Sequence, residues 1–304
     1  MTDICCIGHI TLDKIITPQH ISYMPGGTAY YFSRGMASLH ALTGYKLITA
    51  LGSKEYPVVD ELRKGGIDID VLPSRHTVYF ENRYGENSDN RTQRVLAKAD
   101  PFTIDALHKE NAHFFHLGSL LADDFPPEVI KYLSGKAILS VDAQGYLREV
   151  KGDKVSPIDW PEKQEILKYI DILKVNEHEA TVLTGYTNPQ QAAEQLSAWG
   201  VKEVLLTLGS LGSIILADGF CYKIPAYPPL QTIDATGCGD TYVMGYLYMR
   251  NKGASYPEAG CFAAALSTLK LEKSGPLAAT AEEAYRVINS NRSKVEILQK
   301  DKYY

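Results

Sequence analysis

The sequence lacks the features that mark several large classes of protein. It has no long run of lysine or arginine, its formal net charge is −5 and its pI is about 5.9, so nothing indicates a nucleic acid or an anionic membrane as partner. No segment approaches the roughly eighteen consecutive apolar residues of a membrane-spanning helix. The first stretch, "MTDICCIGHITLDKI", has an early acid and only a short apolar run, unlike a signal peptide. We therefore expect a cytoplasmic protein that acts on small molecules.

Cysteine is also sparse, with five residues in a chain of 304. The number is odd and no CxxC pair occurs, which argues against a zinc site or a disulfide framework and suits a reducing compartment. Apolar residues make up 45% of the chain and charged residues 22%, as in an ordinary globular protein. The length therefore favours a single domain over residues 1–304.

Short apolar runs, each followed by a small or polar residue, favour strands that are buried on both faces of a parallel sheet. These runs lie at residues 4–10, 46–52, 113–120, 137–145, 172–179 and 203–210. Helical patterns lie between them, such as "GTAYYFSRGMASLHAL" and "PQQAAEQLSAWG". The alternation predicts an α/β fold in which a central, mostly parallel sheet is flanked by helices.

One segment, residues 77–99, alternates polar and apolar side chains with period two around the stretch "GENSDN". This pattern predicts a β-hairpin that stands apart from the α/β body. Together with the earlier segment "LDKIITPQHISYMPGG", residues 12–27, it would form a small β-sheet lid. The lid strands would come from about 12–24 and 75–99. A surface hairpin without a role is the alternative. The C-terminal stretch that begins at residue 290 is expected to be a helix with a frayed end.

The stretch "DATGCGD", residues 234–240, carries the strongest functional signal. Its glycine turn can direct backbone N–H groups at one point, and the helix that follows adds the positive end of its dipole. An aspartate at a helix start is also a common cap. In phosphoryl transfer, however, N–H groups can hold the charge of the migrating group while Asp240 takes the proton of an attacking hydroxyl.

Two motifs that the sequence lacks limit the classes of enzyme to which it can belong. No GxxxxGK[ST] stretch occurs anywhere, so the chain is not a P-loop enzyme. No GxGxxG follows the first strand candidate, which weighs against a nicotinamide enzyme.

Motifs along almost the whole chain resemble, in order, those of the PfkB/ribokinase-like carbohydrate kinases. "DATGCGD" resembles the DTxGAGD signature of that family, and "GHITLD" resembles its glycine-to-aspartate segment. "PGG" is similar to its substrate motif, "NEHE" to its N-x-x-E motif and "TLGSLG" to its nucleotide loop. The resemblance implies a ribokinase-like fold with a β lid and an ATP-dependent kinase that uses Mg²⁺. It leaves a requirement for K⁺ open.

The resemblance also assigns roles to residues. Asp240 would be the catalytic base, and the anion hole would consist of Gly237, Cys238 and Gly239. The substrate would be bound by Asp13, Gly26 and Gly27. ATP and Mg²⁺ would be bound by Asn176, Glu179, Thr207, Gly209 and Gly212. Asp234 would help to hold a monovalent cation. Cys238 replaces the usual alanine, and its thiol could be reactive because a helix N-terminus lowers a thiol pKa.

The acceptor is indicated by a second stretch, "VDAQGYLR", which is similar to the D-x-Q-x-x-x-R of inositol-kinase-like members. It would place Asp142, Gln144 and Arg148 over the cleft, while Asn82 would reach the substrate from the lid. Such hydrogen-bonding groups suit a neutral sugar or polyol. Tyr31 stands where many sugar kinases carry asparagine, which argues against plain ribose or fructose.

Other functions remain open at this level. Tyr30, Tyr31 and Phe32 could build a slot for the base of a nucleoside, although aromatic residues at this spacing more often pack a helix into the core. A vitamin kinase of similar fold and a catalytically silent binding module are further alternatives. Since the lid hairpin has open strand edges, we expect that two copies of the chain pair through the lid as a homodimer.

Overall fold

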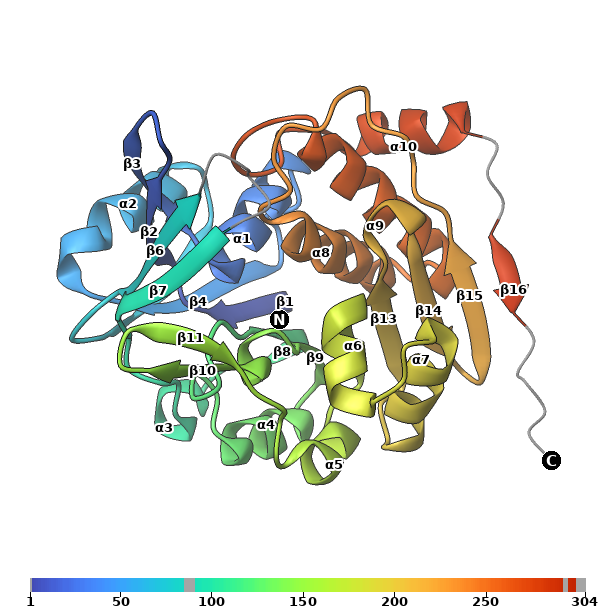
Figure 1. Cartoon of the computed structure of the whole chain (residues 1–304), viewed down its shortest axis with the longest axis horizontal. Coiled ribbons are helices and arrows are strands. Elements are labelled where there is room, and N and C mark those ends of the chain that lie inside the picture. Colours follow the sequence, from blue (N-terminus) through green and yellow to red (C-terminus); the bar gives the residue numbers. More distant parts are fainter. Residues whose placement is uncertain (1, 85–90, 292–294, 299–304) are drawn as a thin grey trace.

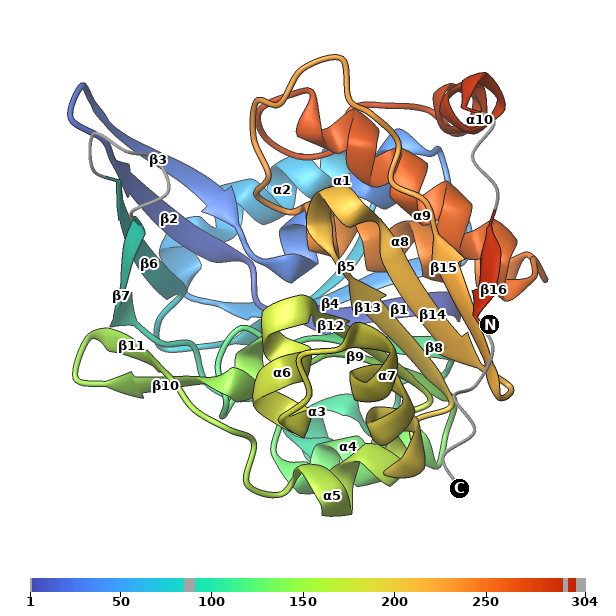
Figure 2. The same ribbon diagram turned by 45° about the vertical axis from the view of Figure 1, so that its right-hand side comes forward.

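The computed structural model describes residues 2–84, 91–291 and 295–298. A large sheet runs through the centre, helices cover both of its faces, and a second, smaller sheet stands to one side (Figure 1, Figure 2). This is the α/β architecture with a small additional sheet that the sequence predicts.

The large sheet has ten strands in the order β16–β15–β14–β13–β12–β9–β8–β1–β4–β5. Every pairing from β13 to β5 is parallel, and the pairings from β13 through β14 and β15 to β16 are antiparallel. All of the predicted apolar runs supply parallel strands. The bounds are β1 Thr2–Gly8, β4 Tyr45–Leu51, β5 Asp68–Pro73, β8 Ala112–Gly118, β9 Ile138–Asp142, β12 Ile172–Asn176, β13 Glu203–Thr207, β14 Ser213–Ala217, β15 Phe220–Ile224 and β16 Glu296–Leu298.

Continuous apolar runs form these strands because both faces of the sheet are covered. In β1, Ile4 and Cys6 belong to one core, whereas Cys5 and Ile7 belong to the core on the opposite face. The first core is covered by α1 (Thr28–Ser38), α2 (Tyr56–Lys64), α8 (Cys238–Asn251), α9 (Tyr256–Leu271) and α10 (Ala281–Ser290). The second is covered by α3 (Ile104–Leu107), α4 (Pro127–Ser134), α5 (Lys163–Ile166), α6 (Glu177–Thr184) and α7 (Pro189–Ala198). None of these helices is long and apolar enough to cross a membrane.

The small sheet has the order β10–β11–β7–β6–β2–β3. Its strands are β2 (Thr11–Ile16), β3 (Ile21–Gly26), β6 (Val78–Tyr84), β7 (Arg91–Ala97), β10 (Arg148–Lys151) and β11 (Lys154–Pro157). The first four lie in the segments expected to supply the lid, whereas the hairpin of β10 and β11 was not expected. The predicted turn at 85–90 lies outside the described residues.

Strand alternation gives the small sheet two different faces. Asp13 pairs with Phe80, and Asn82 pairs with Gln93, which puts all of them on one face with Val95. Phe80 and Val95 pack in a core cluster with residues of the segment after β8, so this face is turned toward the body of the protein. The opposite face carries ion pairs of Glu81 with Lys14 and Arg94, and of Arg94 with Asp153.

The C-terminal stretch differs from the expected helix. Helix α10 ends at Ser290, and residues 296–298 form β16, which pairs with β15 in antiparallel fashion. The open edge of β15 offers backbone partners to a passing chain, so the tail pairs there as a strand. The helix prediction is wrong for this part of the tail.

Candidate active site

The predicted donor-binding residues meet at the carboxyl edge of the large sheet. Asn176 ends β12, Thr207 ends β13, and the two are partners in the parallel register. Ligands bind at this edge in open α/β sheets because loops and helix N-termini converge there. Gly209 and Gly212 have positive φ angles of 58° and 93° and shape the turn between β13 and β14.

The glycine turn of residues 234–240 is held against helix α1. Gly237 has a φ of 78°, and a β-carbon added to it would lie 2.3 Å from the ring of Tyr31. Glycine is therefore required at this position both by backbone conformation and by space. Tyr31 is 3% exposed and Phe32 fully buried, so these two rings belong to the core and not to an open slot for a base.

Helix α8 starts inside this turn. The Cys238 N–H donates to the carbonyl oxygen of Ala235 at 3.2 Å and is used by the turn itself. The N–H groups of Gly239 and Asp240 belong to the first helical turn, where an α-helix offers no internal acceptor. These two N–H groups are the donors best placed to receive an anion.

Asp240 is half-buried at the start of α8. Burial raises its pKa to about 6, the negative charge of Asp142 adds to this rise, and Lys174 and Arg148 oppose it. The carboxyl group is thus mostly ionised at neutral pH, with a basicity close to that expected of a general base.

A buried ion pair of Lys174 and Asp142 lies next to the glycine turn. The Nζ of Lys174 lies 3.0 Å from an Oδ of Asp142, and their side chains are 5% and 1% exposed. Burial lowers the pKa of Lys174, but Asp142, Glu179 and Asp240 raise it by more, so the lysine stays charged. A β-carbon on Gly239 would lie 3.0 Å from this Nζ, which places the ammonium directly beneath the glycine turn. Asp142, which was expected near the active cleft, is thus buried and paired with this lysine.

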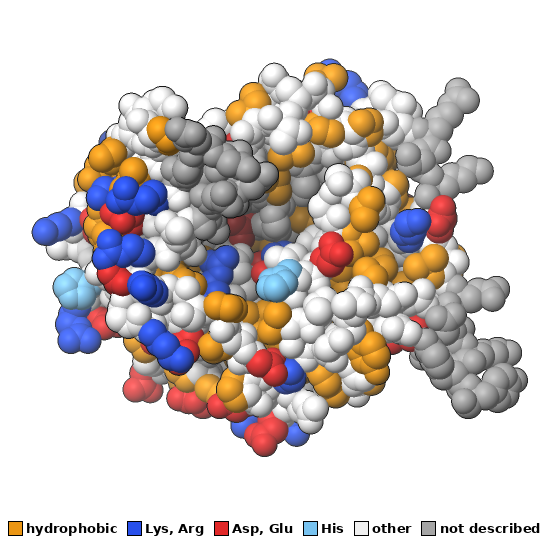
Figure 3. Space-filling model, in the orientation of Figure 1, with side chains coloured by type: hydrophobic (Ala, Val, Ile, Leu, Met, Phe, Trp, Pro, Cys, Tyr) orange, Lys and Arg blue, Asp and Glu red, His pale blue; other side chains and the backbone are white. Residues whose placement is uncertain are grey.

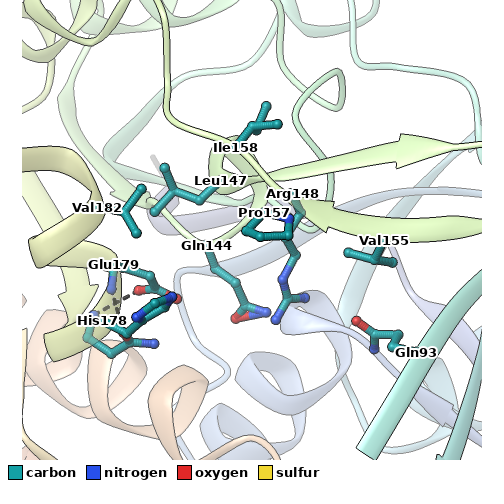
Figure 4. A pocket seen from close by; sticks show the side chains of 11 residues that line it. Gln93, Gln144, Leu147, Arg148, Val155, Pro157, Ile158, His178, Glu179 and Val182 are labelled. Carbon is teal, nitrogen blue, oxygen red and sulfur yellow. Dashed lines mark hydrogen bonds between the residues drawn. The ribbon is translucent and has the colours of Figure 1, made fainter.

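A cleft of about 560 Å³ opens between the β10–β11 hairpin and α6 (Figure 3, Figure 4). It is lined by Gln93, Gln144, Leu147, Arg148, Val155, Pro157, Ile158, Asn176, His178, Glu179 and Val182. With its carboxamide oriented to satisfy its hydrogen bonds, Gln144 accepts from both terminal nitrogens of Arg148, at 2.6 and 2.5 Å. The guanidinium is thereby held in the cleft, and it lowers the pKa of both Asp240 and Glu179.

The residues expected to bind the phosphoryl acceptor lie around Gly26 and Gly27 and on the small sheet. Asp13 accepts a hydrogen bond from the Thr11 hydroxyl at 2.7 Å, and a β-carbon on Gly26 would lie 2.5 Å from its carboxylate. Asn82 is 4% exposed, and its Oδ1 accepts from Gln93 at 2.9 Å. Gln93 reaches the cleft, so this residue, which the motifs did not single out, joins the candidate site.

Most of the chain that carries these features matches a single family. Residues 1–283 match the profile of the pfkB family carbohydrate kinases. The chain belongs to the PfkB family. It is therefore a kinase, a phosphotransferase of sugars or nucleosides, with a ribokinase-like fold.

Three relatives of this PfkB kinase differ in their names and in the molecules with which they were solved. The cytidine kinase of Thermococcus kodakarensis is 29% identical over 274 residues, which is 85% of this chain and 92% of that protein. A pyrophosphate-dependent kinase of the ribokinase family, solved with a pyrophosphate analogue and myo-inositol, is 30% identical with a TM-score of 0.81, covering 93% of this chain and 99% of that one. Arabidopsis thaliana ribokinase, solved with ribose and ATP, shares the fold at 21% identity and a TM-score of 0.75 over 95% and 99% of the chains.

The N-x-x-E motif of this PfkB kinase is a capping box. The Asn176 side chain accepts from the Glu179 N–H, and the Glu179 carboxylate accepts from the Asn176 N–H, both at 2.8 Å. The motif thus begins α6 and lines the cleft at the same time. A variant without this motif would lose the cap of α6 as well, so its loss of activity would not by itself show that the motif binds the phosphoryl donor.

Replacing Glu179 with Gln separates the two roles, since glutamine at this position still caps the helix but carries no charge. We expect Glu179→Gln to keep the thermal stability of the wild type and to raise the Mg²⁺ concentration needed for half-maximal activity several-fold. Glu179→Ala is the matched comparison and should lose stability as well, by about 1 kcal/mol. Equal Mg²⁺ dependence in Glu179→Gln and wild type would remove the metal role.

The surroundings of Cys238 disfavour a reactive thiol. Burial raises its pKa to about 11, more than the positive charge of Lys270 lowers it, and its Sγ lies 3.7 Å from the carbonyl oxygen of Ser267. The expected lowering by the helix N-terminus is outweighed because the group is taken out of water. The thiol stays protonated at neutral pH.

Asp234 is surrounded by donors of the chain itself. Its carboxylate accepts from the N–H groups of Thr236 at 2.9 Å and Gly275 at 3.2 Å, and from the Lys270 ammonium at 3.0 Å. The residue that was expected to help hold a monovalent cation is thus paired with a lysine.

Proposed function

We propose that this protein transfers the γ-phosphoryl group of ATP to a hydroxyl of a sugar or polyol, with an inositol-like acceptor favoured. The observation that carries the proposal is the placement of Asp240, whose pKa of about 6 suits a proton acceptor, on the helical turn whose N–H groups can hold an anion. Membership of the PfkB family supports the same chemistry.

In the proposed mechanism, Asp240 takes the proton of the acceptor hydroxyl as its oxygen attacks the terminal phosphorus. The N–H groups of Gly239 and Asp240, together with the Lys174 ammonium beneath them, stabilise the negative charge that the phosphoryl group carries. The oxygen ligands offered by Asn176 and Glu179 suit Mg²⁺, which would neutralise phosphate charge when it is bound. Within the described part of the chain, no three His, Cys, Asp or Glu side chains could hold a metal together, so Glu179 would act alongside donor phosphates and water.

The acceptor would bind between Asp13, the glycine pair and the inner face of the lid. Asn82, Gln93 and Gln144 add amide groups there, which suits an acceptor with many hydroxyls, since an analogue lacking one would leave a polar group unpaired. The relative that was solved with myo-inositol supports this choice. Closure of the lid would exclude water as a competing acceptor.

A nucleoside acceptor is the second candidate, because the cytidine kinase relative matches most of the chain. Of the three aromatic residues considered for a base slot, only Tyr30 is more than slightly exposed. A vitamin kinase of similar fold and a catalytically silent binding module are further alternatives, and the presence of Asp240 with its glycine turn argues against the binding module.

Pyrophosphate is a second candidate for the donor. The relative solved with a pyrophosphate analogue is 30% identical across nearly the whole chain. Lys174 and Arg148 place positive charge around the glycine turn and the cleft, which suits an inorganic polyphosphate as well as the phosphates of a nucleotide.

The deciding experiment combines each donor, ATP or pyrophosphate with Mg²⁺, with a panel of polyols, sugars and nucleosides. Phosphorylated product is measured by mass spectrometry, and Asp240→Asn serves as the inactive control. We expect turnover above the control with a polyol such as myo-inositol. Turnover confined to nucleosides would replace the acceptor, turnover confined to pyrophosphate would replace the donor, and ligand-induced melting shifts without any product would favour a binding module.

We also propose that the chain is one cytoplasmic domain over residues 1–304 that forms a homodimer through the lid. The five cysteines are all free thiols, as expected in a reducing compartment. Strand β3 is the last strand of the small sheet among the described residues, and it carries Ile21 and Tyr23 at 58% and 60% exposure. Light scattering at the 33.6 kDa of one chain would exclude the dimer.

A further inference from the structure

The glycine turn is fastened to helix α9 by contacts that include a fully buried lysine. Lys270 lies in the last turn of α9, and its side chain is 0% exposed. Its Nζ donates to the Asp234 carbonyl oxygen at 2.7 Å, to the Asp234 carboxylate at 3.0 Å and to the Lys273 carbonyl oxygen at 3.5 Å. The three donors of an ammonium are therefore matched by three oxygens, and the cation needs no water.

These oxygens are the kind that hold a monovalent cation. Backbone carbonyl oxygens replace the hydration shell of K⁺ in proteins, and a nearby carboxylate adds negative charge. The same set is occupied here by an ammonium that is covalently attached to the chain. A separate K⁺ bound by the Asp234 carbonyl and carboxylate oxygens would stand close to this ammonium and be repelled by it. The residues present therefore do not fit an additional K⁺ at Asp234.

Lys270 lies where α9 contacts the glycine turn of residues 234–240, which is the segment that such a cation would stabilise. The N–H groups of Ile233 and Asp234 both donate to the Leu271 carbonyl oxygen, at 2.9 and 3.3 Å. The Ser267 hydroxyl, one turn before Lys270 on α9, donates to the Cys238 carbonyl oxygen at 3.2 Å. The turn is thus held on both sides of Gly237, and the shape that directs its N–H groups is fixed by α9 itself.

We propose that Lys270 is a built-in substitute for a monovalent cation, so that the turn of residues 234–240 takes its active shape without K⁺. Lys270 is a positioning residue in this view, because it acts through Asp234 and the glycine turn. The inference bears on the proposed kinase function, but it can be tested on the purified protein without any substrate.

The first experiment compares melting temperatures in KCl and in tetramethylammonium chloride at equal ionic strength. We expect the wild type to melt at the same temperature in both salts. Lys270→Ala should melt several degrees lower in tetramethylammonium chloride, because Asp234 loses its partner, and K⁺ should restore most of the loss in a saturable way. A purely structural lysine would show the loss but no cation-specific recovery, and that outcome would overturn the proposal.

Lys273→Ala is the matched control, since Lys273 lies on the same segment but its Nζ donates to the Ala278 carbonyl oxygen, at 3.1 Å. The melting temperature of Lys273→Ala should be the same in KCl and in tetramethylammonium chloride. Should Lys270→Ala fail to fold, crystals of the wild type soaked in Tl⁺, a heavy analogue of K⁺, give an independent answer. No anomalous density is expected at Asp234, and a Tl⁺ bound there would contradict the inference. Neither measurement depends on whether the kinase assay succeeds.

Discussion

Asp240→Asn is expected to lower kcat by about 10²–10⁴-fold, the usual loss when a general base is removed. The amide has nearly the shape of the carboxyl group, so α8 and the glycine turn should be unchanged. Because the pKa of Asp240 is about 6, wild-type activity should also fall as the pH drops below about 6, where the base becomes protonated. Steady-state rates across pH, with the best acceptor from the panel, measure both effects.

The matched control is Asp60→Asn, on the exposed face of α2. It makes the same chemical change far from the cleft and should keep wild-type rates and the same acidic limb. A mutant at Asp240 that retained near-full turnover would remove this residue from the role of base, whatever the control did.

Lys174→Met is expected to damage both the fold and the reaction. It leaves Asp142 buried without its ion-pair partner, and removing one member of a buried pair costs about 3–5 kcal/mol of unfolding free energy. It also removes the ammonium that lowers the pKa of Asp240, so the acidic limb of the rate profile should move to higher pH. Denaturant unfolding and the pH profile measure the two effects separately.

The double variant Asp142→Asn with Lys174→Met distinguishes a structural lysine from one that serves the reaction. Asparagine keeps the oxygen that accepts from the Gln144 N–H at 3.0 Å, and position 142 no longer carries a buried charge without a partner. We expect much of the lost stability to return while kcat stays low, because the positive charge beneath the glycine turn is still missing. Recovery of kcat together with stability would show that Lys174 acts on the fold alone.

The central strands could be predicted because burial on both faces leaves a plain mark in the sequence. A run such as "ICCIG" must be apolar throughout when alternate residues enter different cores. Strands β10 and β11 escaped prediction because "REVK" and "KVSP" are short and contain no fully buried residue, so neither an apolar run nor a clear alternation marks them. The tail strand β16 was missed for a related reason, since it depends on the edge of β15 and not on its own pattern.

The site shows a similar division. Residues that lie in one contiguous motif, such as Gly237 and Asp240, can be proposed from the sequence because backbone geometry and charge there are set locally. Lys174 and Lys270 were missed because a lysine in an apolar stretch gives no hint of its partner, which in both cases is more than thirty residues away. An isolated lysine among strand or helix core residues is the one signal that could have raised the question, since such residues are rarely buried unless paired.

The small sheet draws its strands from three separate stretches of chain, and this limits how the protein can be re-engineered. Exchanging one hairpin with a homologue would leave its former neighbours with mismatched hydrogen-bonding edges and would separate Asp13 from Asn82. Acceptor preference should thus be exchangeable between relatives by point substitutions on the inner face of the small sheet, or by transferring all three stretches together. Transfer of a single stretch should fail.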